Sequence, residues 1–357
     1  MIDNLIVFDR AWNSNDRGLV SVIESLPDGE EHLIVCRGKV NDLHKFTVLE
    51  NTFGFENRYI GAILTHAYSP FSFLYFFWLV IRYKPSTVYL REVRYLHFFS
   101  FFKALGFNLF IKLDVRENVE TNFNYSLIYF KICLCFVDQF FTNSIGLKRF
   151  YEDRYKIEKI QLRYALPASR FFSGFDEIKS GSLVRSNDVV KLVFFGDIKE
   201  DRLLHDFIDS LRSIDSGWKF DIFGKCRDRQ YFDKLTKKAL GLPIIFNGEM
   251  SYSGASGKLA NYDVGVMFND VNQNSRYTIP GKLWEYLASG LPVITNTRDS
   301  LNSFDVGSFG WVCDDFDEVS RVLQSILLDR KKIKEKITGV RIFYKTIVEM
   351  VEGQKYF

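Results

Sequence analysis

The sequence predicts an α/β protein with two doubly wound domains in tandem. Short apolar runs rich in β-branched and aromatic residues alternate with helix-length segments along the chain. Most of these runs are apolar on both faces, as strands of a parallel sheet covered by helices are. The chain has 357 residues, more than one hydrophobic core usually supports, so two domains are expected.

Strands in the first half are predicted at NLIVFD, STVYLR, NLFIKLD and QFFTNS, with helices over residues 71–83, 94–105 and 123–136. The segment Phe71 to Ile81, FSFLYFFWLVI, is apolar on every face. As a helix it rises about 16 Å, which is too short to span a bilayer. It is therefore either a core helix or one that lies against a membrane or a partner.

Strands in the second half are predicted at VVKLVFFG, WKFDIFG, PIIFNG, DVGVMF and LPVIT. The helices between and after them are expected over residues 200–213, 228–239, 256–261, 280–289 and 316–328. The predicted domains are residues 1–170 and 189–330, joined by a linker over 171–188, where Ser, Gly and charged residues replace the apolar pattern. Residues 331–357 are predicted to form a helix that packs back towards the first domain.

Composition excludes several classes of protein. The net charge is +3, and the first 170 residues hold 21 basic and 18 acidic side chains, so the whole excess lies there. This is too little for a nucleic-acid-binding protein of this size but suits weak attraction to an anionic membrane. Five scattered cysteines without zinc-ligand spacing are predicted to be buried free thiols in a reducing cytosol. The N-terminus reads as a first strand and not as a signal peptide, which favours a cytoplasmic protein.

Two loops of the second half carry groups suited to an anionic ligand, because such ligands bind at the carboxyl ends of parallel strands. Gly196 ends a predicted strand, and Lys199 and Arg202 follow where a helix is expected to begin. On their own, such residues more often form an ordinary surface turn.

The stretch IPGKLWEYLASGLPVI, Ile279 to Ile294, is the stronger signal. Pro280 and Gly281 suit a helix start with bare amides. Lys282, Glu285, Tyr286 and Ser289 then lie toward one side of the helix. Lys282 and Glu285 are about 4.5 Å apart along the helix axis. That separation fits a phosphate followed by a sugar diol. The alternative is a Lys–Glu pair on a helix surface, worth only about 0.3–0.5 kcal/mol.

The second half closely resembles the nucleotide-sugar domain of retaining GT-B glycosyltransferases, a group with many bacterial sugar-polymer enzymes. The signature residues are Pro280, Lys282, Glu285, Tyr286, Ala288, Gly290, Pro292 and Val293. FFGDIKEDRLLHDFI, WKFDIFG and IIFNGEMSYSGASGKLANYDVGVMF follow the family's order. The resemblance implies a GT-B fold, with two Rossmann-like domains facing a central cleft.

The resemblance also implies roles for individual residues. Glu285 would hold the ribose hydroxyls, Arg202 or Lys199 the diphosphate, and the loop after PIIFNG would lie by the base. The predicted donor-binding residues are Gly196, Lys199, Arg202, Gly248, Glu249, Met250, Tyr277, Pro280, Gly281, Lys282 and Glu285. Catalytic roles are predicted for Arg202, Lys282 and Arg116.

Two residues depart from the family pattern. Tyr277 stands where many members have a Glu that contacts the transferred sugar, and Asp197 stands where an Arg often follows the first glycine. Lys282 is expected to supply the missing positive charge.

The first half resembles the family's acceptor domain through FIKLDVRENVE, with Asp114, Arg116 and Glu117, and through VDQFFTNSIGLKRFYEDRYKI. RAWNSNDRGL adds Arg17 as an acceptor-side candidate.

The function implied is transfer of a sugar from a UDP- or GDP-sugar to a saccharide or lipid-linked saccharide in bacterial surface polysaccharide synthesis. No metal or other cofactor is expected, and catalysis would consist of positioning and stabilisation of diphosphate charge. The predicted partners are the donor, the acceptor and a membrane contacted peripherally by the first domain, with no nucleic acid. Two alternatives stay open: a nucleotide-sugar epimerase, and a non-catalytic sugar-nucleotide or acceptor-binding subunit of a transferase complex.

Overall fold

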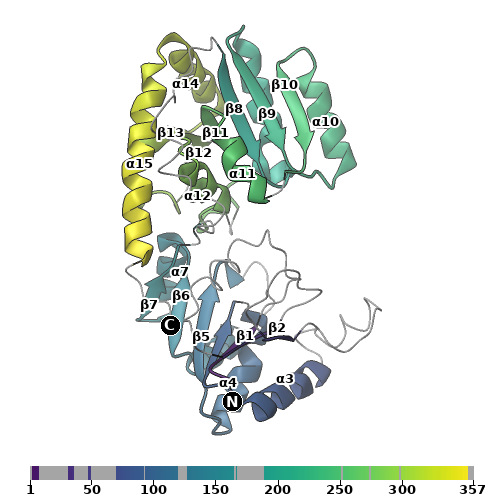
Figure 1. Ribbon diagram of the computed structural model, residues 1–357, viewed down its shortest axis with the longest axis vertical. Helices are drawn as coiled ribbons and strands as arrows, with labels where there is room; N and C mark the ends of the chain where they lie inside the picture. The colour runs from purple at the N-terminus through teal and green to yellow at the C-terminus, as the bar shows by residue number, and fades with distance from the viewer. Residues whose placement is uncertain are drawn as a thin grey trace. The chain divides into compact units, whose positions relative to one another are not determined.

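The computed structural model describes residues 2–7, 31–35, 47–49, 70–91, 93–119, 127–164, 166, 189–250, 252–272, 275–296 and 299–352. The chain forms two compact units, unit 1 ending at Tyr164 and unit 2 following it (Figure 1). The predicted linker, residues 171–188, lies outside the described residues, and its role stays a prediction. No helix in the described ranges is both long enough and apolar enough to cross a membrane.

Unit 1 contains a parallel sheet whose described strands run in the order β3-β2-β1-β4-β5-β6-β7. The strand β1 is central, because its Leu5 pairs with Leu33 on one side and with Val88 on the other. The strands are β1 (Asn4–Val7), β2 (His32–Val35), β3 (Thr47–Leu49), β4 (Thr87–Leu90), β5 (Phe110–Val115), β6 (Gln139–Thr142) and β7 (Ile160–Leu162).

The described helices of unit 1 are α3 (Pro70–Tyr83), the 3₁₀ turn η1 (Val93–Tyr95), α4 (Leu96–Ala104), α6 (Leu127–Leu134) and α7 (Ile145–Tyr155). Local sequence explains both ends of α7. The hydroxyl of Ser144 accepts a hydrogen bond from the Leu147 amide at 3.0 Å. Lys156 takes the left-handed conformation, with φ 57°, and ends the helix.

All four strands predicted in the first half are present, but β2, β3 and β7 were not predicted. Each has only three or four residues, HLIV, TVL and IQL, which carry little periodicity; β1, β4 and β6 are also only four residues long but were predicted within longer stretches of the pattern. The helix predicted over 123–136 is described only as α6, since residues 120–126 lie outside the described ranges.

Unit 2 repeats the architecture with a parallel sheet in the order β10-β9-β8-β11-β12-β13. The strands are β8 (Val190–Phe195), β9 (Trp218–Phe223), β10 (Ile244–Gly248), β11 (Val264–Met267), β12 (Val293–Asn296) and β13 (Gly310–Cys313). The helices are η4 (Glu200–Arg202), α9 (Leu204–Ser210), η5 (Leu211–Ser213), α10 (Arg229–Ala239), α11 (Tyr252–Leu259), α12 (Gly281–Ala288), α13 (Val306–Phe309), α14 (Phe316–Leu328) and α15 (Lys331–Glu352).

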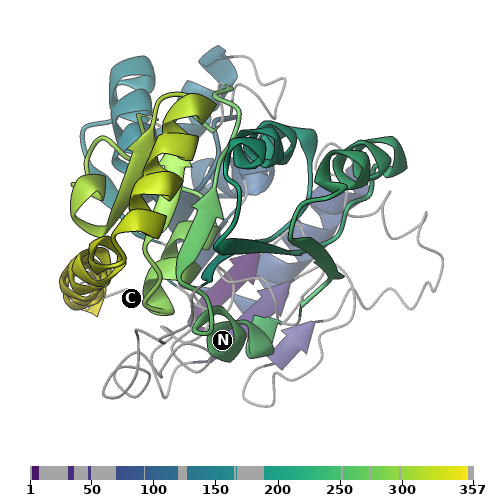
Figure 2. The same cartoon turned by 90° about the horizontal axis from the view of Figure 1, so that it is seen from above.

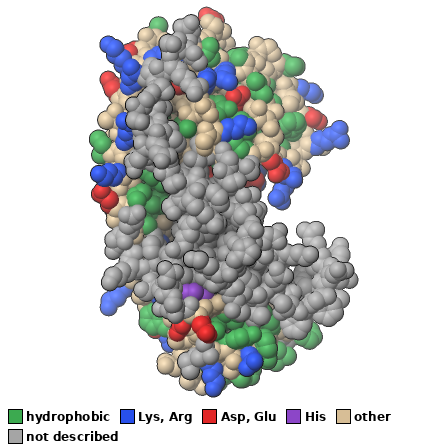
Figure 3. All heavy atoms as spheres, in the orientation of Figure 1, with side chains coloured by type: hydrophobic (Ala, Val, Ile, Leu, Met, Phe, Trp, Pro, Cys, Tyr) green, Lys and Arg blue, Asp and Glu red, His purple; other side chains and the backbone are tan. Residues whose placement is uncertain are grey.

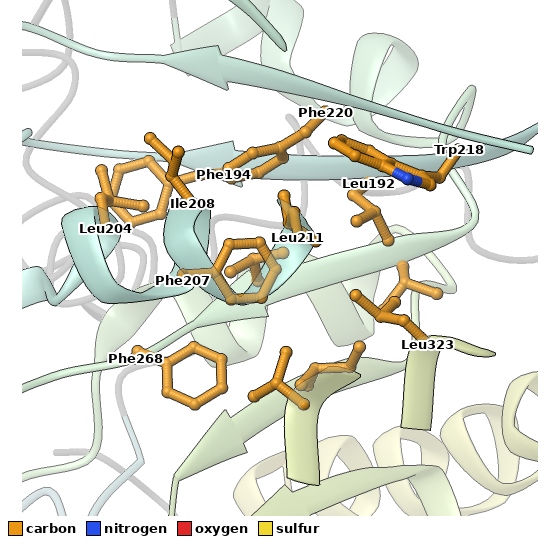
Figure 4. Close-up of a cluster of buried hydrophobic side chains, with 14 of the residues drawn as sticks. Leu192, Phe194, Leu204, Phe207, Ile208, Leu211, Trp218, Phe220, Phe268 and Leu323 are labelled. Carbon is orange, nitrogen blue, oxygen red and sulfur yellow. The ribbon is translucent and has the colours of Figure 1, made fainter. Parts of the chain in front are cut away.

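Asp side chains cap the N-termini of two helices of unit 2, α10 and α14. Asp228 accepts from the Tyr231 amide at 3.0 Å, and Asp315 accepts from the Glu318 amide at 2.7 Å. Glu318 accepts in return from the Asp314 amide at 2.8 Å. Buried side chains of unit 2 form a cluster around Phe194, where aromatic rings from α9, β8 and β9 meet (Figure 4).

The C-terminal helix α15 packs along α12, α13 and α14 of unit 2 (Figure 1), and Figure 2 shows it nearly end-on. Gly339 permits this approach, because a Cβ there would lie 1.9 Å from the Ser308 carbonyl oxygen. The predicted packing of this helix towards the first domain stays a prediction.

Candidate functional site

The chain order in unit 2 reverses between β8 and β11, which are neighbours while β9 and β12 lie on their outer sides. Ligands of open parallel sheets bind at such a switch point, outside the carboxyl ends of the strands. The loops after β8 and β11 are joined there, because the Asp270 amide donates to the Asp201 carbonyl at 2.7 Å. Gly196, the residue after β8, therefore stands at the centre of this edge.

Helix α12 begins at the same edge. Pro280 is the residue just before the helix and not its first residue as predicted, and Gly281 is the first residue in helical conformation. No side chain of the described residues caps this end. The Leu283 amide bonds the Pro280 carbonyl at 3.0 Å, so the amides before it are the ones available to the loop or to an anion.

Lys282 and Glu285 are both buried, with 8% and 0% of their surface exposed. The Nζ of Lys282 lies 3.8 Å from the centroid of the Phe194 ring, a close cation–π contact. The same Nζ lies 3.5 Å from where a Cβ would be on Gly196, whose φ is +131°. The backbone conformation therefore favours glycine at this position, and a bare backbone faces the ammonium group.

The predicted grouping of Tyr286 with Lys282 and Glu285 on one side of α12 is wrong. Every residue from Lys282 to Ala288 is buried. Tyr286, expected beside Glu285, faces the sheet: its hydroxyl accepts from the Phe195 amide at 2.9 Å, and its ring covers Gly265, where a Cβ would lie 2.7 Å away. Helical periodicity cannot distinguish a helix buried all round from one that faces a ligand.

The loop after β8 also differs from the prediction. The α-helix begins at Leu204, after a 3₁₀ turn, so Arg202 and Lys199 do not lie in its first turn. Arg202 is about one-quarter exposed, with Nε 3.6 Å from Asp201 Oδ1. Lys199 is exposed, with Nζ 3.7 Å from Asp197 Oδ2. The two cations therefore precede α9 and do not lie at its N-terminal amides as predicted.

The predicted base-binding loop, Gly248 to Met250, adjoins the loop after β9. Gly248 is the last residue of β10, with φ +71°, and its carbonyl accepts from the Gly224 amide at 2.8 Å. Glu249 is exposed and pairs with Lys225 at 3.2 Å, while Met250 is half-buried. The Gly196 amide after β8 donates to the Phe223 carbonyl of β9 at 3.0 Å, so backbone hydrogen bonds connect the ends of β8, β9 and β10. Tyr277 is half-buried near the Arg276 guanidinium, at 5.8 Å, and Arg276 pairs with Asp299 at 2.5 Å.

Two asparagines at the strand ends were not predicted. Asn269 follows β11 and is buried, and Asn296 is the last residue of β12. Asn296 Nδ2 donates to the Asn269 carbonyl at 2.8 Å, and its Oδ1 accepts from the Asn269 amide at 3.3 Å. An Asn at or just beyond the end of each of two buried strands is a signal that the sequence offers.

In unit 1, the predicted acceptor-side residues fall into a buried network. Asp114 is fully buried, and its Oδ2 accepts from the Tyr89 hydroxyl at 2.7 Å and from Arg116 Nη2 at 2.9 Å. Arg163 donates to the Tyr89 hydroxyl at 2.9 Å and stacks its guanidinium 5.4 Å from the Phe141 ring centroid. The sequence did not indicate Tyr89 or Arg163, which come from β4 and the segment after β7 and join Asp114 only in the folded sheet.

Electrostatics keep Asp114 ionised. Burial alone would raise the pKa of this carboxyl, but Arg116, Arg163 and the hydrogen bonds from Arg116 and Tyr89 together lower it. Burial, followed by the Asp114 charge, raises the pKa of Tyr89. Glu117 is exposed, and its carbonyl accepts from the Tyr151 hydroxyl at 2.9 Å. Arg17 lies outside the described residues.

Within the described ranges, no three His, Cys, Asp or Glu side chains gather as metal ligands would. Metal independence stays a prediction.

No family model and no curated protein matches the sequence. Solved structures match over nearly the whole chain. HepE from Anabaena, in complex with UDP and glucose, has a TM-score of 0.71 at 11% identity, covering 99% of this chain and 98% of its own. Sucrose-phosphate synthase from Thermosynechococcus elongatus has a TM-score of 0.71 at 13% identity, covering 97% and 94%. The lipopolysaccharide outer core galactosyltransferase WaaB has a TM-score of 0.66 at 15% identity, covering 98% and 99%.

These matches, with the two parallel sheets, define the class of fold. The chain has the GT-B fold, an α/β architecture of two Rossmann-like domains, as the sequence predicted. In particular, it shares that fold with HepE, sucrose-phosphate synthase and WaaB. At 11–15% identity the likeness extends to the fold and not to the substrates.

Proposed function

We propose that the protein is a glycosyltransferase that moves a sugar from a UDP- or GDP-sugar to a saccharide or lipid-linked saccharide acceptor. The observation that carries the proposal is the pair Lys282 and Glu285, buried one helical turn apart at the switch point of unit 2, beside Gly196. A cation and a carboxylate in this order suit the phosphate and ribose of one nucleotide. The fold of HepE, which was solved in complex with UDP-glucose, supports a UDP-sugar donor.

The proposed reaction retains the configuration of the sugar. Lys282 and the first amides of α12 stabilise charge on the departing diphosphate, with Arg202 from the loop after β8. The acceptor hydroxyl attacks the anomeric carbon from the face that the diphosphate leaves; the bond from that carbon to the diphosphate breaks, and the departing diphosphate takes the hydroxyl proton. No resident metal takes part in this proposal. The acceptor belongs to bacterial surface polysaccharide synthesis, and the enzyme works in the cytoplasm, at the inner face of the plasma membrane.

Isothermal titration calorimetry with UDP, GDP and their sugars tests the donor site through Glu285→Gln, which keeps the side-chain shape. Two charge-assisted hydrogen bonds, each worth about 1.5–3 kcal/mol, are weakened, so affinity for the nucleotide should fall on the order of 100-fold or more. Glu335→Gln, at an exposed position of α15, is the matched control and should bind as the parent does.

Thermal unfolding of the same variants shows whether each is folded. Equal nucleotide affinity in folded Glu285→Gln and parent contradicts the assignment of Glu285. Absence of nucleotide binding by the parent contradicts the proposed donor. Nucleotide binding without donor hydrolysis or transfer, across a range of acceptors, would instead favour the non-catalytic subunit.

A further inference from the structure

The outward faces of three unit 1 helices, α3, α4 and α6, are apolar. Ten large hydrophobic side chains are exposed among the described residues of unit 1, and nine of them lie on α3, α4 and α6 or at the residue that ends α4. We call these nine the apolar helix face: Phe71, Leu74, Trp78, Ile81, Phe101, Leu105, Ile128, Tyr129 and Ile132. In Figure 3, hydrophobic side chains gather over the part of the molecule that α3 and α4 occupy in Figure 1.

The three helices form one layer, so the apolar helix face is continuous. Phe73 of α3 and Phe101 of α4 meet edge to face, with ring centroids 5.5 Å apart. The Ser100 hydroxyl of α4 donates to the Cys133 carbonyl of α6 at 3.1 Å. A contiguous exposed patch of this kind on a monomeric protein marks an interaction surface.

Helix α3 shows that the exposure is not a by-product of core packing. Phe76, Leu79 and Val80 are buried and supply its inner face. Phe71, Leu74, Trp78 and Ile81 recur at steps of three and four residues and are each about half exposed. An ordinary surface helix carries polar residues on that second stripe.

The charges on this layer are of one sign. The sequences of α3, α4 and α6 contain Arg82, Lys103 and Lys131 but no Asp or Glu. Arg82 and Lys131 are exposed, as is Lys84 directly after α3. Lys103 pairs with Asp138 at 2.5 Å. A second copy docked face to face would bring cations opposite cations, because symmetric contacts use the same patch on both partners. An anionic surface complements both features.

We propose that the apolar helix face docks onto an anionic lipid bilayer, with the three helices lying in the interface plane. Hydrophobic side chains enter the boundary between headgroups and acyl chains, and Trp78 and Tyr129 suit the headgroup level. Arg82, Lys84 and Lys131 contact the anionic headgroups. None of the described helices is long and apolar enough to span the bilayer, so the contact is peripheral.

The position of α6 connects this surface to the acceptor side. Ile128 and Tyr129 lie in its first turn, and α6 follows β5, whose end carries Asp114 and Arg116. Helix starts in such units lie at the carboxyl edge of the sheet. Docking therefore brings that edge beside the membrane, which favours a lipid-linked acceptor; this last step rests on the proposed function.

Co-sedimentation of the full chain with lipid vesicles tests the proposal. The parent should bind vesicles that contain phosphatidylglycerol more strongly than vesicles of phosphatidylcholine alone. The variant Leu74→Glu/Trp78→Glu should bind on the order of tenfold or more weakly, since two insertions are lost. The matched control is Leu328→Glu/Ile342→Glu in unit 2, whose side chains are 89% and 66% exposed, and it should bind as the parent does.

A charge variant separates the two contributions. Arg82→Glu/Lys131→Glu should lose binding to the anionic vesicles and leave the weak binding to phosphatidylcholine unchanged. Nucleotide affinity should stay the same in all variants, so a failed donor assignment and a failed docking surface give different results. The proposal is overturned if the parent binds neither kind of vesicle, or if Leu74→Glu/Trp78→Glu binds vesicles as the parent does. It is also overturned if the parent binds no vesicles but is a dimer that Leu74→Glu/Trp78→Glu converts to a monomer.

Discussion

The helices of the two units differ on the side that faces solvent. Helix α10 in unit 2 exposes Arg229, Gln230, Asp233, Lys234 and Lys237 and buries Tyr231 and Leu235. Helix α3 in unit 1 also buries one apolar stripe, but its exposed stripe is apolar too. Both helices cover a parallel sheet of the same kind, so the fold requires only the inner stripe. The outer stripe is free to serve another purpose, which in unit 1 is the docking surface proposed above.

The packing of the two units also offers different features to test. Unit 1 buries a charged network, in which Asp114 bonds Arg116 and, through Tyr89, Arg163. Unit 2 contains close approaches at glycine, of the Ser308 backbone to Gly339 and of the Tyr286 ring to Gly265. A buried charge and a missing Cβ respond differently to substitution and to pH, and two substitution experiments use this difference.

The largest effect is expected for Asp114→Asn in unit 1. Removing one partner of a buried ion pair leaves the guanidinium groups of Arg116 and Arg163 uncompensated and typically costs about 3–5 kcal/mol of unfolding free energy. Urea denaturation at neutral pH measures this cost. Asp153→Asn, at an exposed position of α7, is the control and should change little.

The loss in Asp114→Asn should depend on pH with a definite sign. The folded protein lowers the pKa of Asp114, so its contribution is present above the unfolded value of about 3.9 and disappears as the pH falls through the folded value. The difference between parent and variant should therefore shrink on acidification. A difference that is constant from neutral to acid pH would show that the loss is steric and not electrostatic.

A smaller effect, steric and not electrostatic in origin, is expected for Gly339→Ala in unit 2. The new Cβ would meet the Ser308 carbonyl at 1.9 Å, so α15 must shift, which costs about 1–3 kcal/mol. Gly257→Ala in α11 is the matched control, because nothing lies within 4 Å of its Cβ position. It should stabilise unit 2 by about 0.5–1 kcal/mol. Thermal unfolding compares the two, and a stabilising Gly339→Ala would refute the close packing of α15.

The smallest perturbation is thiol labelling, which leaves the structure unchanged. The sequence predicted buried thiols; Cys133 and Cys313 are buried, but Cys135, at the end of the unit 1 helix layer, is exposed. Burial raises the pKa of Cys313 to about 12, so its thiolate is scarce as well as covered. In a Cys36→Ser background, Cys135 should react first and Cys313 only on unfolding. Rapid labelling of Cys313 in the native protein would contradict the described core of unit 2.

The sequence by itself determined the α/β class, the two-domain GT-B fold, every described strand longer than four residues and five of the strands with four residues. Apolar period and length carry that information locally, as in VVKLVFFG and WKFDIFG. The short strands β2, β3, β7 and β13 were missed; three or four residues carry little periodicity, and such segments depend on their neighbours in the sheet to become strands.

In the candidate donor site, too, some features follow from the sequence and others only from the tertiary structure. The order of residues in IPGKLWEYLASG indicated the positions of Lys282 and Glu285, because a helix fixes what lies three residues apart. Only the tertiary structure decided that Tyr286 faces the sheet, that Arg202 precedes the α-helix, and that Asn269 and Asn296 join the edge. It likewise assembled Asp114 with Tyr89 and Arg163, which lie far apart in sequence and meet because parallel strands bring their carboxyl ends to one side.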